Sequence, residues 1–179
     1  MFKLISKTIA AVAIVSVALF GSAHAKTLKI ETHFTASSPN GEVAAQFAKN
    51  VEKFSGGSLK VQMFYSSSVT GKSAEVFNSA QTGIIDCDMT GAGYQTGKNA
   101  AFQFAGDVMG GYDNPYQQYE FLNFPGAQEA VDALYNKYGM TLIGWWIPGH
   151  ESLISSRPIP DVASLKDFKF RSPPGMESM

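Results

Sequence analysis

Residues 27–65 read TLKIETHFTASSPNGEVAAQFAKNVEKFSGGSLKVQMFY, and this stretch decides the fold class. Apolar and polar side chains alternate over 27–32 and again over 59–65, the pattern of half-buried strands. Between them, apolar residues recur at helical spacing from 41 to 54, and Gly56-Gly57 ends the helix. A strand, a helix and a strand joined in this order predict a parallel unit of an α/β fold.

The pattern continues towards the C-terminus. Residues 72–82 are typical of a helix closed by Gly83, and 84–89 of a third strand. A glycine-rich loop, 90–97, follows at the carboxyl end of that strand, where its backbone can approach a small ligand. The loop matches neither the P-loop nor the dinucleotide pattern, so it indicates no phosphate site.

The second half of the chain predicts further elements. Helices are expected over 116–124 and from Pro125 to Tyr138, and a dense apolar strand over 140–146. The run 152–156 is expected to cross into a second lobe. Two prolines then break the chain, and a short polar helical turn over 161–167 precedes a brief strand, 168–171.

The N-terminal residues 1–25 have the features of an export signal. Lys3 and Lys7 precede an apolar run over 9–20, and Ala23-His24-Ala25 is a small-residue cleavage site. A membrane anchor is the alternative, but the run is shorter than the roughly 20 residues that span a bilayer. We therefore expect cleavage after Ala25, a mature chain that begins at Lys26, and a location in the periplasm.

The composition excludes several classes of protein. The 179 residues are 45% hydrophobic and 16% charged, with a formal net charge of -1. These values are not those of a disordered chain, and they make nucleic acid an unexpected partner. Cys87 is the only cysteine, so the chain can form no intrachain disulfide and has no pair of cysteines spaced as in a zinc site.

Arg171 is the main candidate for a functional residue. It ends the predicted strand 168–171, and ligands of open α/β sheets collect outside the carboxyl ends of strands. A guanidinium fixed there by the corner Ser172-Pro173-Pro174-Gly175 can hold a carboxylate by two parallel hydrogen bonds. The alternative is a solvated surface arginine, which spacing alone favours.

Motifs around Arg171 resemble a known family. Arg157-Pro158-Ile159, Ser164-Leu165-Lys166-Asp167, Lys169-Phe170-Arg171 and Pro173 resemble the central signature of the DctP-like solute-binding proteins of tripartite ATP-independent periplasmic (TRAP) transporters. Asp167 stands where the family usually has glycine. The stretch 98–104 and Gly111-Tyr112-Asp113 look like the α-keto-acid-binding branch of that family.

The resemblance implies a fold and a function. It implies a two-lobed α/β fold of the type II periplasmic-binding-protein kind, of which this chain looks like the N-terminal half. Residues 26–151 would form the first lobe, and 152–179 the crossover and the truncated start of the second. It further implies that the protein binds a small organic acid through Arg171 and delivers it to TRAP permease subunits, without catalysis.

Four further residues are candidates for contact with the ligand. His33 follows the first strand, Tyr94 lies in the glycine-rich loop, and Trp146 ends the apolar strand over 140–146. His150 follows Pro148-Gly149. Each has a structural alternative: a loop histidine bonded to backbone, or an aromatic side chain that packs in the core.

Glu151 departs from the family pattern. A carboxylate in the cleft would repel a second acidic group on the ligand, which favours a monocarboxylate such as a keto or hydroxy acid. Glu151 then either accepts a hydrogen bond from the ligand or joins it in holding a cation. A glutamate at the rim facing water is the alternative; no other cofactor is expected.

A small periplasmic hydrolase that uses His33 or His150 is the rival interpretation. No serine or cysteine lies in a nucleophile elbow, which weighs against it.

Overall fold

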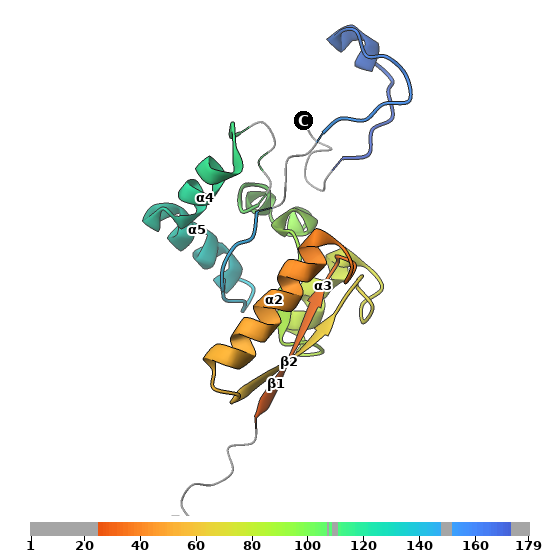
Figure 1. Ribbon diagram of the computed structural model, residues 1–179. Helices are drawn as coiled ribbons and strands as arrows, with labels where there is room; N and C mark the ends of the chain where they lie inside the picture. Colours follow the sequence, from red (N-terminus) through yellow and green to blue (C-terminus); the bar gives the residue numbers. More distant parts are fainter. Residues whose placement is uncertain (1–24, 107, 109–110, 148–151, 173–179) are drawn as a thin grey trace, which may run out of the picture.

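The computed structural model describes residues 25–106, 108, 111–147 and 152–172. Its centre is a three-stranded parallel sheet in the order β2-β1-β3 (Figure 1). The strands are β1 (Lys26–Thr32), β2 (Leu59–Phe64) and β3 (Cys87–Met89). The predicted α/β class and the parallel pairing of the first two strands are therefore confirmed.

The register aligns the carboxyl ends of the strands. Glu31 of β1 has Phe64 and Asp88 as its Cα partners on the two neighbouring strands. Asp86 helps to set this register, because its carboxylate accepts a hydrogen bond from the Lys29 amide at 2.8 Å and its own amide donates to the Lys29 carbonyl at 2.8 Å. The loops after all three strands consequently emerge at one edge of the sheet.

Helix α2 (Pro39–Phe54) lies across the sheet (Figure 1). The Ser38 hydroxyl caps it by accepting a hydrogen bond from the Gly41 amide at 3.1 Å. Its buried residues are small, Gly41, Ala44 and Ala48, whereas Phe54 at its end is exposed. Small side chains let the helix approach the sheet closely, which the spacing of its larger apolar residues did not predict.

The elements that follow β2 include those that form an apolar cluster. They are the 3₁₀ turns η1 (Ser73–Glu75), η2 (Ala92–Gln95) and η3 (Ala100–Phe104), and the helices α3 (Val76–Gln81), α4 (Pro115–Asn123) and α5 (Pro125–Asn136). The cluster consists of Phe77, Ala92, Phe102, Ala105 and Leu134. Ile30 and Glu31, which point to opposite faces of β1, are both fully buried, so this strand is covered on both sides.

Several elements cover fewer residues in the structure than the sequence predicted. The helix predicted over 72–82 is divided into η1 and α3, and the strand predicted over 84–89 pairs only over Cys87–Met89. Cys87 is half-buried there, and burial together with the Asp86 charge raises the pKa of its thiol. The other helices match their predicted positions within about two residues.

The strand predicted over 140–146 is wrong. These residues form no ladder, and the Leu142 amide instead donates a hydrogen bond to the Asp132 carboxylate of α5 at 3.0 Å. A strand requires a neighbour that satisfies its backbone groups, and the described residues offer none here. Trp145 and Trp146 of this run are both partly buried.

The brief strand predicted over 168–171 is also wrong, and the run 152–156 forms none either. Residues 152–172 contain the single turn η4 (Val162–Leu165), capped by the Asp161 carboxylate, which accepts from the Ser164 amide at 2.8 Å. This segment extends away from the sheet (Figure 1), so no described strand is available to pair with it. The predicted boundary at 151/152 adjoins residues outside the described part and stays a prediction.

None of the helices in the described ranges has both the length and the apolar character needed to cross a membrane.

Candidate functional site

The loops at the carboxyl edge of the sheet bring aromatic side chains together. His33 follows β1 directly, and Tyr94 lies in η2, beyond β3. Their ring centroids are 5.4 Å apart in an edge-on arrangement. Phe34 lies 3.9 Å from His33 and 4.6 Å from Trp146, measured between ring centroids. We call His33, Phe34, Tyr94 and Trp146 the aromatic cluster.

The structure thus brings together three of the predicted contact residues: His33, Tyr94 and Trp146. Phe34, which contacts both His33 and Trp146, was not among the predicted residues. Phe34 was not distinguished by its spacing, because it lies beyond the last paired residue of β1, in a loop with no periodicity. Its position next to His33 at a strand end was the available signal.

His33 has an unusual environment. Its Nδ1 atom is buried and has no hydrogen-bond partner among the residues that the structure describes. Burial lowers the pKa of His33, because desolvation disfavours the charged imidazolium. A neutral imidazole presents one donor and one acceptor, so the side chain can bond a polar group on a small molecule. Trp145 Nε1 is likewise buried without a described partner.

The loop after β2 has strained backbone at the same edge. Ser66 and Ser67 have φ values of 57° and 50°, in the left-handed region that favours glycine. Their amides donate to the carbonyls of Phe34 at 2.9 Å and Thr32 at 3.1 Å, which fastens this loop to the end of β1. Such strain persists where the surroundings enforce it, often at ligand sites.

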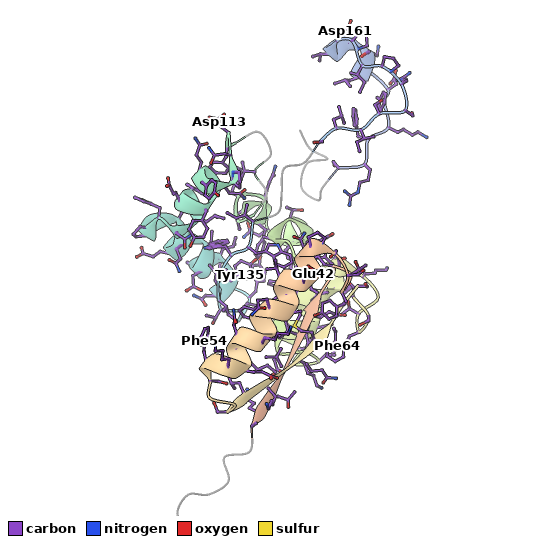
Figure 2. The ribbon with its side chains drawn as sticks, in the orientation of Figure 1. Glu42, Phe54, Phe64, Asp113, Tyr135 and Asp161 are labelled. Atoms are coloured by element: carbon purple, nitrogen blue, oxygen red, sulfur yellow. The ribbon has the colours of Figure 1, made fainter. Side chains whose placement is uncertain are left out.

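Arg171 does not join the aromatic cluster in this structure. It is exposed in the segment that extends from the sheet, whose outer tip carries Asp161 (Figure 2). Contacts within the segment itself hold it together. The Arg157 guanidinium lies 4.5 Å from the centroid of the Phe168 ring, and the ring centroids of Phe168 and Phe170 are 4.8 Å apart.

Asp167 adopts a φ of 61°, which explains physically why the resembling family has glycine at this position.

His150 and Glu151 lie outside the described residues, so their predicted roles are untested. In the described part of the chain, no group of three or more histidine, cysteine, aspartate or glutamate side chains is placed to hold a metal ion.

Comparison with known proteins identifies relatives. The model of the family "Bacterial extracellular solute-binding protein, family 7" (DctP) matches residues 30–179. No curated protein sequence matches the chain.

Solved structures of TRAP periplasmic solute-binding proteins are similar to it. One from Rhodobacter sphaeroides, in an apo open form, is 25% identical with a TM-score of 0.61, over 66% of this chain and 37% of that one. One from Pseudoalteromonas atlantica, with bound sodium and pyruvate, is 20% identical with a TM-score of 0.58, over 64% and 34%.

A third, from Bordetella bronchiseptica, contains copurified calcium and picolinate; it is 21% identical with a TM-score of 0.57, over 63% and 33%. The chain therefore spans about a third of the length of these structures. Their fold supports the predicted periplasmic-binding-protein architecture.

Proposed function

Because the chain belongs to family 7 of the bacterial extracellular solute-binding proteins, we propose that it binds a small organic monocarboxylate in the periplasm and delivers it to a TRAP permease. The observation that carries this proposal is the aromatic cluster at the carboxyl edge of the sheet, with the neutral His33 side chain and its unpartnered Nδ1 atom. Edges of this kind are where open α/β sheets bind small molecules.

The chemistry of the cluster suits a small, flat, polar ligand. Aromatic faces from Phe34, Tyr94 and Trp146 offer apolar contact, while His33 offers a single polar atom that needs a partner. Similar proteins have been solved with pyruvate and with picolinate, both flat monocarboxylates. A keto or hydroxy acid of this size is the class of ligand we propose.

Arg171 supplies the charge that this ligand requires. We propose residues 26–151 as the first lobe and 152–179 as the start of the second, so that Arg171 approaches the aromatic cluster when the two lobes close on the ligand. A ligand that contacts both lobes binds the closed state better and shifts the population towards it. The open form of one similar protein fits a cycle of this kind.

A cation is a further candidate for the site. Two of the similar proteins hold sodium or calcium together with their organic acid. Glu151 is the residue we propose to share such a cation with the ligand, since a carboxylate oxygen is a ligand that calcium prefers.

Substitution of Arg171 tests the proposal. In a closed cleft, loss of the guanidinium leaves the ligand carboxylate uncompensated at a cost of about 3–5 kcal/mol, which weakens Kd by about two to four decades. Arg171→Lys keeps the charge but loses the planar fork, so it should weaken binding less than Arg171→Ala does. The measurement is calorimetric titration with pyruvate and with the acid that copurifies with the protein.

Lys169→Ala is the matched control, because Lys169 is an exposed cation two residues away with no proposed contact. Affinities within about threefold for all four proteins would make Arg171 a surface residue, since exposed ion pairs contribute ~0–1 kcal/mol. Incubation with an ester or amide of the copurified acid examines the rival hydrolase that uses His33 or His150, because a hydrolase would consume it and a binding protein would not.

A further inference from the structure

Two acidic side chains lie side by side in the sheet, directly before the loops that form the candidate site. Glu31 of β1 and Asp88 of β3 are Cα partners in a parallel pairing. Partners in a parallel ladder project from the same face, on strands about 4.8 Å apart. The two side chains therefore lie on neighbouring strands, Glu31 two residues before His33 and Asp88 two residues before Thr90.

Glu31 is buried completely and is only partly satisfied. Its relative exposure is 0%. Oε1 accepts hydrogen bonds from the amides of Val69 at 2.7 Å and Thr70 at 3.3 Å. Oε2 is buried and has no partner among the described residues. A buried carboxylate oxygen without a donor is costly, so this atom requires an explanation.

Asp88, like Glu31, has one carboxyl oxygen that lacks a hydrogen-bond partner. Its Oδ1 atom is also buried without a described partner. Burial raises the pKa of Asp88 to about 6; hydrogen bonds from the Thr90 side chain and backbone to the carboxyl group lower that pKa in part, and the Glu31 charge raises it. No cation among the described residues contributes to the shift.

The elements around Asp88 bring no compensating charge. α3, which packs against β3, has the sequence VFNSAQ and no ionisable side chain. Tyr135 of α5 packs against Phe77 of α3, with 6.0 Å between the two ring centroids. Burial, and then the Asp88 charge, raises the pKa of this phenol, so Tyr135 stays neutral at physiological pH. The facing titratable groups are thus Glu31 and a neutral tyrosine.

One proton shared between the two carboxyl groups gives both unpartnered oxygens a hydrogen-bond partner. Two carboxylates on adjacent strands in a buried site repel each other, whereas a carboxylic acid can donate its O–H to a neighbouring carboxylate. We propose that Glu31 and Asp88 hold a single shared proton between Glu31 Oε2 and Asp88 Oδ1, which makes the carboxyl edge of this sheet a proton-binding site.

The proton links folding to pH. Asp88 binds a proton more tightly when folded than when unfolded, where its pKa is 3.8. The stabilisation that this proton provides is therefore fully present below about pH 4 and is lost as the pH rises through about 6. The shift corresponds to about a 100-fold difference in proton affinity between the folded and unfolded chains.

The first measurement is the melting temperature of the protein between pH 4.5 and 8, without ligand, for the wild type, Glu31→Gln and Asp88→Asn. Each amide places an N–H where the shared proton would lie and removes one charge. We expect the wild type to lose roughly 4–8 °C more than either variant over this range. Glu129→Gln, on α5 and exposed, is the control and should follow the wild type.

The second measurement needs no variant. The carboxyl carbon of Asp88, followed by NMR in the wild-type protein, should titrate near pH 6. A midpoint near 4, or parallel melting profiles for all four proteins, would overturn the proposal. So would a rise in the melting temperature at pH 8 on addition of calcium or sodium that both amide variants lose, since the pair would then hold a cation and not a proton. These tests use no organic acid, so they are independent of the proposed transport function.

Discussion

Ser66 and Ser67 show how single residues are constrained at the candidate site. Both have left-handed backbone, which costs about 1–2 kcal/mol for a residue with a Cβ atom. Their amides hold the β2 loop against the end of β1, next to His33. The backbone conformation is therefore imposed by hydrogen bonds to another strand and not by the residue type.

The exposed Ser66 provides a test of this strain. Ser66→Gly removes the left-handed penalty and leaves the amide bond to the Phe34 carbonyl intact. Glycine also loosens the unfolded chain, so the expected net gain is about 0.5–1 kcal/mol in the free energy of unfolding. Urea denaturation measures it.

Ser68→Gly is the control, because Ser68 is exposed and is not among the residues with positive φ. Only the unfolded-state cost acts there, so a loss of about 0.5–1 kcal/mol is expected. Equal shifts for the two variants would mean that Ser66 is not strained.

At the scale of elements, α2 lies close against a neighbouring loop. A Cβ atom on Gly41 would lie 2.0 Å from the Thr35 carbonyl oxygen and 2.9 Å from that of Ala36. These backbone atoms cannot rotate away as a side chain would. The helix is thus fixed against the loop that leads from His33, and this contact requires glycine in the first turn.

Gly41→Ala should therefore reverse the usual effect of this substitution. Alanine in a helix normally gains about 1 kcal/mol over glycine. Here we expect a loss of about 1–3 kcal/mol or more, because the loop must move. Thermal denaturation measures it, with Gly97→Ala as a control at a glycine that has open space around it. A more stable Gly41→Ala protein would contradict the contact.

At the scale of the whole molecule, β1 is the strand on which the fold depends. It lies in the middle of the sheet, pairs with both other strands, and begins at Lys26. The predicted cleavage after Ala25 therefore leaves the central strand intact.

N-terminal sequencing of periplasmic material should give Lys26 as the first residue. Ala25→Tyr places a large side chain where the cleavage rule requires a small one, so the precursor should accumulate in the membrane fraction. Ala36→Tyr, outside the signal, serves as the control for expression. A mature chain that begins beyond Thr32 would lack the central strand and would refute the assignment.

The sequence by itself determined the elements that depend on local chemistry. Alternating side chains placed β1 and β2 nearly to the residue, and glycine and proline positions marked the limits of α2, α4 and α5. The motif around Arg171 also led to the family that the match over residues 30–179 establishes.

Only the tertiary structure decided which strands form and which side chains meet. Residues 140–146 and 168–171 have strand-like patterns but no ladder, because a strand exists only where a neighbour satisfies its amides and carbonyls. The contact of Phe34 with Trp146 and the pairing of Glu31 with Asp88 join residues far apart in the chain. Such contacts depend on sheet register, and register is a property of the packed sheet that no single segment contains.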